Sequence, residues 1–166
     1  MQIVVNDTNI FIDLIHIELI DKFCQLPYEF HTTDFVINEI EETYQEAIIL
    51  QLIEAGRLIV ASLAAIEIDD IILLQETVTR LSIPDCSVWY YSKKNNYTLL
   101  TGDNVLRKTA EKDHITVRGI LFIFDELVRF GFLAPLEAIA KLRLLLETGC
   151  RLPGDACNEG FERWSI

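Results

Sequence analysis

Residues 3–11 read IVVNDTNIF, and this short stretch decides which kind of fold to expect. The apolar run at residues 3–5 has no polar interruption, which is typical of a central strand covered on both faces. Asp7 ends that run, and Thr8 and Asn9 are residue types that cap helices. The stretch therefore predicts a buried strand followed directly by an acidic residue and the start of a helix.

The alternation of strand and helix continues along the chain. Further strands are predicted at residues 28–32, 58–60, 97–100 and 115–117. Helices are predicted at residues 8–23, 34–40, 47–53, 64–81, 85–94, 103–112, 120–129 and 135–147. Strands that alternate with helices indicate an α/β fold in which helices sandwich a parallel sheet.

The length of 166 residues is most simply that of one domain. We expect this domain to span residues 1–148, with a core at 1–120 followed by two helices. Residues 149–166 contain Pro153, Gly154 and Gly160 and are predicted to form a loosely structured tail, which Phe161 and Trp164 tack down.

Composition indicates a soluble cytoplasmic protein. Apolar residues make up 51% of the chain, yet no apolar run reaches the roughly 20 residues that a membrane helix needs. The first residues lack a basic region, so we expect no signal peptide. The cysteines (Cys24, Cys86, Cys150 and Cys157) lack zinc-type spacing, and only the last two are placed to form a bridge. Reduced thiols in a cytosol fit this pattern.

The chain has 14 basic and 26 acidic residues, a net charge of −12 that repels nucleic acid at long range. A bound metal ion or a basic partner chain would cancel part of this charge. Most of the acidic residues are expected to form a solvated surface.

Four acidic residues stand where apolar runs give way to loops or helix starts: Asp7, Glu39, Asp85 and Asp103. In parallel sheets ligands bind beyond the carboxyl ends of strands, where Asp7 and Asp103 fall. Taken singly, Asp85 and Asp103 read as helix caps and Glu39 as a solvated helix residue. Taken together, the four carboxylates suit a divalent cation such as Mg²⁺ or Mn²⁺, which prefers hard oxygen ligands.

Polar neighbours of these acids are candidates to hold a carboxylate or a water molecule by hydrogen bonds. They are Thr8, Asn9, Thr101 and Asn104. Metal sites usually orient their ligands through such partners.

Four segments carry a resemblance to a known family. They are DTNIFIDL at residues 7–14, NEI at 38–40, LSIPD at 81–85 and LTGDNVLR at 100–107. In order, spacing and local secondary structure they resemble the four acidic motifs of PIN-domain nucleases, over residues 1 to about 120. The resemblance assigns the family's aspartates to Asp7, Asp85 and Asp103, its glutamate to Glu39, and its hydroxyl before the fourth acid to Thr101.

This resemblance implies a three-layer α/β/α sandwich with a parallel sheet of about five strands. It also implies Mg²⁺- or Mn²⁺-dependent cleavage of single-stranded RNA, as in the toxins of VapBC toxin–antitoxin pairs. An antitoxin-like partner protein and a homodimer are expected on the same ground. The extra helical segment at 120–166 and the acidic charge balance depart from the usual toxin pattern.

The mechanistic hypothesis is metal-assisted phosphodiester hydrolysis by an endoribonuclease. Asp7 and Asp103 would be the principal metal ligands, completed by Asp85 and Glu39 directly or through water. Substrate phosphates would meet basic residues that follow the third and fourth acids in sequence: Lys93, Lys94, Arg107 and Lys108. The alternative is that these are ordinary exposed cations at helix ends.

Two other functions of parallel α/β proteins fit the sequence less well. A phospho-receiver domain needs paired acids after its first strand, and a haloacid-dehalogenase-type phosphatase needs a second Asp where Asn9 stands. The remaining rival is a PIN-fold protein–protein interaction or regulatory module with little or no nuclease activity. The dense apolar stretch at residues 121–133 is interpreted as core, or otherwise as a dimer or antitoxin interface.

Overall fold

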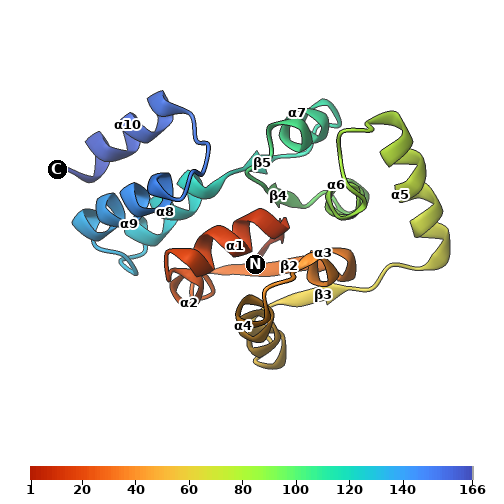
Figure 1. Cartoon of the computed structure of the whole chain (residues 1–166), viewed down its shortest axis with the longest axis horizontal. Coiled ribbons are helices and arrows are strands. Elements are labelled where there is room, and N and C mark those ends of the chain that lie inside the picture. The colour runs from red at the N-terminus through yellow and green to blue at the C-terminus, as the bar shows by residue number, and fades with distance from the viewer. Residues whose placement is uncertain (166) are drawn as a thin grey trace.

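The computed structural model describes residues 1–165, and its centre is a five-stranded parallel sheet with strand order β3-β2-β1-β4-β5 (Figure 1). The strands are β1 (Gln2–Asn6), β2 (Tyr28–Thr33), β3 (Ile59–Ala61), β4 (Thr98–Leu100) and β5 (Val117–Arg118). Every pairing is parallel. The prediction of a parallel sheet of about five strands is therefore confirmed.

Strand β1 is central, as its apolar run predicts. Val5 is fully buried and is in register with His31 of β2 on one side and Leu99 of β4 on the other. From β1 the chain moves outward through β2 to β3, and it later returns to the other side of β1 to form β4 and β5. The carboxyl ends of β1 and β4 therefore meet at the point where the strand order reverses, which is the usual ligand site of such sheets.

Helices surround the sheet. Within the described residues they are α1 (Thr8–His16), α2 (Ile20–Phe23), α3 (Asp34–Glu39), α4 (Thr43–Glu54), α5 (Ala65–Thr77), α6 (Ile83–Asn95), α7 (Asn104–Lys112), α8 (Ile120–Arg129), α9 (Pro135–Glu147) and α10 (Gly154–Trp164). Helix α6 packs against β1, β2 and β4, and α5 packs on α6. Helices α8, α9 and α10 contact one another and gather at the side of the molecule opposite α5 (Figure 1). None of the helices within residues 1–165 is long and apolar enough to cross a membrane.

Some predicted helix boundaries were wrong. The helix predicted at 8–23 is interrupted at Glu18, whose φ of 57° lies in the left-handed region, so α1 and α2 are separate helices. The helix predicted at 64–81 ends at Thr77.

The loosely structured tail predicted at 149–166 was also wrong for the described part of that segment. Residues 154–164 form helix α10, and Trp164 fixes this helix to α8. Its ring stacks on Phe124 with 5.5 Å between the ring centroids, and its Nε1–H donates to Asp125 Oδ1 at 3.0 Å. Trp164 is only 4% exposed, so its expected role in tacking the segment down is confirmed.

The apolar stretch at residues 121–133 is mostly core. Ile123, Phe124, Leu127 and Leu133 are buried, whereas Phe130 is exposed. The interpretation as core is confirmed for the buried side chains, and the homodimer stays a prediction. All four cysteines are free thiols.

Candidate metal centre

Asp7 lies directly after β1 and is 1% exposed. It is the N-cap of α1. The prediction that Thr8 or Asn9 caps this helix was therefore wrong. Its Oδ1 accepts a hydrogen bond from the Thr8 backbone N–H at 2.7 Å, and its Oδ2 accepts one from Thr101 Oγ1, also at 2.7 Å. The carboxylate is therefore fixed from two adjacent strand ends.

Asp103 follows β4 and is the N-cap of α7, as predicted. Its Oδ1 accepts from the Leu106 backbone N–H at 2.7 Å, and its own N–H donates to Thr101 Oγ1 at 3.0 Å. The single hydroxyl of Thr101 thus contacts both strand-end acids, one through its carboxylate and the other through its backbone.

Asp85 does not open its helix, because α6 begins two residues earlier, at Ile83. Ser82 is the N-cap: its Oγ accepts from the Asp85 backbone N–H at 3.2 Å. In return, Asp85 Oδ2 accepts from Ser82 N–H and Ser82 Oγ, each at 2.8 Å. This is a reciprocal capping box, and the pattern Ser82-x-x-Asp85 was the sequence signal that could have shown it.

Glu39 is the last residue of α3 and is exposed. Its Oε2 accepts a hydrogen bond from Thr8 Oγ1 at 2.5 Å, which joins α3 to the start of α1. The hydroxyl of Thr8 therefore orients one acid while its backbone N–H holds another, Asp7.

These acids border one hollow of about 340 Å³ at the carboxyl ends of β1 and β4. Its lining is Asp7, Thr8, Asn9, Ile12, Glu39, Ser82, Asp85 and Asp103. All four predicted acids are thus brought to one place by the fold. Of the predicted polar neighbours, Thr8 and Asn9 line the hollow, and Thr101 is buried and bonded to Asp7. Asn104 lines a separate hollow that has no lining residue in common with this one. Ser82 and Ile12 are lining residues that the sequence did not reveal.

The hollow is strongly negative. No Lys, Arg or His nitrogen within residues 1–165 lies within 4.0 Å of the carboxylate of Asp7, Glu39, Asp85 or Asp103. Burial, together with the charges of Asp85 and Glu39, raises the pKa of Asp7 to about 7, although the hydrogen bonds from Thr101 and Thr8 lower it. A cation in the hollow would reverse this effect, because it would favour the ionised carboxylate.

The residues fit a hydrated divalent cation. Glu39 Oε1, Asp85 Oδ1 and Asp103 Oδ2 accept no hydrogen bond from the described residues and remain available as hard oxygen ligands. In the described part of the chain, no group of three or more acidic, histidine or cysteine side chains is placed to hold a metal ion by itself. Mg²⁺ usually keeps several waters and takes only one or two carboxylates directly, so a closed protein cage is not required.

The predicted substrate contacts lie in different settings. Lys93 is ion-paired with Asp113 at 2.9 Å, and Lys94 with Glu67 at 2.7 Å, so both are engaged away from the hollow. Lys108 is exposed on α7, and Arg107 of the same helix is half-buried and donates to the backbone carbonyls of Val117 and Thr101. A role for these four residues in RNA binding stays a prediction.

A family model described as DUF3368, a PIN domain, matches residues 3–165. The chain belongs to the PIN-domain family. This match runs through α8, α9 and α10, so the C-terminal helices of this PIN domain lie within the matched family unit. No curated protein sequence matches the chain.

Among solved structures, this PIN domain is similar to a chain in the crystal structure of VapBC2 from Rickettsia felis bound to a DNA fragment from their promoter. The TM-score is 0.47 and the identity 15%, with 71% of this chain and 98% of that chain covered.

Proposed function

We propose that this PIN-domain protein is a divalent-metal-dependent endoribonuclease that hydrolyses phosphodiester bonds of single-stranded RNA. One observation carries the proposal: the carboxylates of Asp7, Glu39, Asp85 and Asp103 border one hollow and have no cationic side chain within 4.0 Å among residues 1–165. Uncompensated carboxylates at a buried strand end are costly unless a cation joins them. PIN domains are generally nucleases that use divalent metals.

In this proposal Asp7 and Asp103 are the principal ligands of Mg²⁺ or Mn²⁺, and Asp85 and Glu39 complete the site directly or through water. When bound, such an ion offsets the charge of the phosphate and lowers the pKa of a coordinated water.

The chain's own residues orient the groups and move the proton. Thr101 holds Asp7 at the required place, and Thr8 does the same for Glu39. Glu39 and Asp85 each present an unbonded carboxylate oxygen at the hollow and are the two candidates to accept the proton of the attacking water.

The proposal extends to a biological role. On the resemblance to VapBC toxins, the protein acts in the cytoplasm as a toxin, is held inactive by an antitoxin-like protein and forms a homodimer. A gene immediately upstream that encodes a small DNA-binding protein with a disordered tail would support this role.

The alternative is an interaction module of PIN fold with little or no nuclease activity. It is favoured by the absence, within residues 1–165, of three potential ligands gathered closely enough to enclose an ion. In such a module the hydrogen bonds from Thr8, Ser82 and Thr101 would serve only to satisfy the acids.

A pair of measurements separates these functions. A nuclease should gain thermal stability with Mn²⁺ by mass action and should cut single-stranded RNA only when the metal is present. Asp7→Asn should abolish cleavage and leave the circular dichroism spectrum native. Asp69→Asn, which removes an exposed acid of α5, is the matched control and should cut normally. Absence of a thermal shift at millimolar Mn²⁺, with no cleavage by the parent, would favour the module. Full cleavage by Asp7→Asn would overturn the assignment of Asp7 to the metal site.

A further inference from the structure

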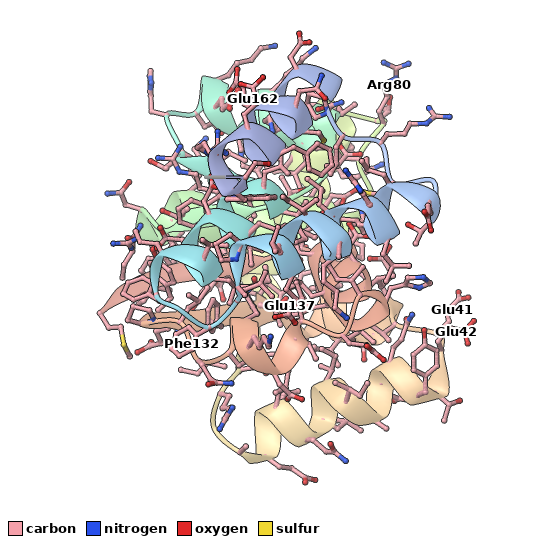
Figure 2. All side chains as sticks on the ribbon, turned by 90° about the vertical axis from the view of Figure 1, so that its left-hand side faces the viewer. Glu41, Glu42, Arg80, Phe132, Glu137 and Glu162 are labelled. Atoms are coloured by element: carbon pink, nitrogen blue, oxygen red, sulfur yellow. The ribbon has the colours of Figure 1, made fainter. Side chains whose placement is uncertain are left out.

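The acidic surface of this protein repels RNA, except near basic side chains that form no ion pair. Glu41, Glu42 and Glu162 project outward from the molecule in Figure 2, in keeping with the net charge of −12. Several basic residues are neutralised by ion pairs within the chain: Lys22, Lys93, Lys94, Arg129, Lys141 and Arg163. An RNA strand that reaches the carboxylate hollow must therefore be held by cations that remain free.

Two further hollows lead away from the carboxylate hollow. The first, of about 250 Å³, shares Asn9 and Asp103 with it. The second, of about 330 Å³, shares Gly102 and Arg151 with the first. The three hollows therefore adjoin one another in series, from the acids at the ends of β1 and β4 to the segment that precedes α10.

Arg151 belongs to both outer hollows. It is exposed, and no carboxylate of residues 1–165 lies within 4.0 Å of its guanidinium. The side chain is thus a free planar cation, with the five donors that suit a phosphate. It comes from the C-terminal segment, for which the sequence offered no functional role.

Arg107 supplies a second cation, in the farther hollow. Its guanidinium is anchored by Nη2–H donating to Thr101 O at 3.4 Å and Nη1–H donating to Val117 O at 3.5 Å. Its only ion pair among the described residues is a long one of 3.7 Å to Glu111. A Cβ at Gly119 would lie 2.9 Å from Nη2, so the glycine leaves the space that Arg107 occupies.

Besides Asp103, a second acid, Asp13, borders the nearer hollow. Asp13 accepts a hydrogen bond from Cys150 Sγ at 3.5 Å, and burial raises the pKa of its carboxyl group. This carboxyl group is therefore bonded to the same C-terminal segment that carries Arg151, and helps to fix that segment against α1.

We infer that Arg151 and Arg107 form a binding track for the phosphate backbone of single-stranded RNA, next to the carboxylate hollow. In this track Arg151 contacts a phosphate that adjoins the cleaved bond, and Arg107 contacts the phosphate beyond it. The inference depends on the proposed ribonuclease function for its substrate, and it gives the C-terminal segment a positioning role rather than a catalytic one.

The test uses a fluorescein-labelled oligouridine of about 12 nucleotides as the probe. Fluorescence anisotropy measures its Kd for the full chain in EDTA, where no cleavage occurs. We expect Arg151→Glu to weaken binding about tenfold and Arg151→Lys to weaken it much less, because charge is kept. Arg151→Ala should reduce the slope of log K against log salt by about 0.7, the value for one lost contact to a single strand.

Arg143→Glu is the matched control. Arg143 is an exposed arginine of α9 that lies 5.6 Å from the Phe161 ring centroid and lines neither hollow. Arg143→Glu changes the net charge by the same amount as Arg151→Glu. Equal weakening of RNA binding in the two variants would indicate a general electrostatic effect and would overturn the inference. Unchanged Kd in Arg151→Glu, or no binding of the oligonucleotide by the parent, would overturn it as well.

With Mn²⁺ present, cleavage gives a second readout. Arg151→Ala should raise KM about fivefold to tenfold with kcat nearly unchanged, as expected when a contact to the substrate backbone is lost. A parent that binds RNA through Arg151 but never cuts it would contradict the proposed nuclease function and still support the track. A fall in kcat alone would contradict the track.

Discussion

Thr101 Oγ1 donates a hydrogen bond of 2.7 Å to Asp7 Oδ2 and thereby joins the carboxyl ends of β1 and β4. The same oxygen accepts the backbone N–H of Asp103 at 3.0 Å. Thr101 is fully buried, so water does not replace either bond. The relative position of the two strand-end acids therefore depends on one hydroxyl group.

Thr101→Val should cost about 1–3 kcal/mol of unfolding free energy, because it leaves a carboxylate oxygen and a backbone N–H unpaired in the interior. Urea denaturation measures the loss. Thr101→Ser keeps the hydroxyl and is the control, with a much smaller effect. Equal losses in both variants would mean that the methyl group, rather than the hydrogen bonds, supports the site.

The stability of the metal-free protein should fall as the pH rises from about 4 to about 7. Burial raises the pKa of Asp7 from the ordinary 3.8 to about 7, so the folded protein binds this proton more tightly than the unfolded chain does. Ionisation of Asp7 therefore lowers the unfolding free energy across this pH window, by on the order of 4 kcal/mol in total. Above the window the loss does not grow further. Urea denaturation in EDTA across the window measures this dependence, and stability that rises steadily with pH would contradict it.

Asp7→Asn should remove that pH dependence and should be more stable than the parent at about pH 8 in EDTA, since the amide never ionises. Added Mn²⁺ should stabilise the parent and leave the variant unchanged. Asp69→Asn, at an exposed position, should follow the parent in both measurements. A variant less stable than the parent at every pH would show that the carboxylate is needed for folding.

The sheet could be predicted because its signals are local. The unbroken apolar run at residues 3–5 indicated the central strand, and the alternation of strand and helix patterns indicated a parallel sheet. Helix α10 could not be predicted in the same way. Its first turn and its interior contain Gly154 and Gly160, poor helix formers, and its stability comes from packing of Trp164 that is visible only in the folded chain.

The candidate site was predictable as a set of residue types but not as a set of contacts. The bond between Thr8 and Glu39 joins residues 31 positions apart, and the bond between Asp7 and Thr101 joins residues 94 apart. Which hydroxyl meets which acid depends on strand order and helix entry angles. Arg151 carried no motif at all, and its place beside the acids follows from the fold of the C-terminal segment.

Two substitutions of Asp85 should affect stability differently and activity alike. Asp85→Asn keeps an acceptor for Ser82 and should change the unfolding free energy by less than about 0.5 kcal/mol, whereas Asp85→Ala should cost about 1 kcal/mol through loss of the capping box. If the carboxylate takes part in the reaction, both variants should lose cleavage to a similar extent. Cleavage by Asp85→Asn at the rate of the parent would leave Asp85 with only its structural role as the partner of Ser82 in the capping box.

Trp164→Ala should cost about 3–5 kcal/mol, because it empties a buried aromatic position against Phe124 and leaves Asp125 without its indole donor. Trp164→Phe is the control, because it keeps an aromatic ring against Phe124 and loses only the indole hydrogen bond. It should lower the unfolding free energy by about 1–2 kcal/mol. Because α10 begins at Gly154, a short distance after Arg151 in the chain, partial release of the helix should also weaken oligouridine binding. If Trp164→Ala unfolds α10 and RNA affinity is unchanged, then the position of Arg151 does not depend on α10, and the C-terminal segment is held by Asp13 and Cys150 alone.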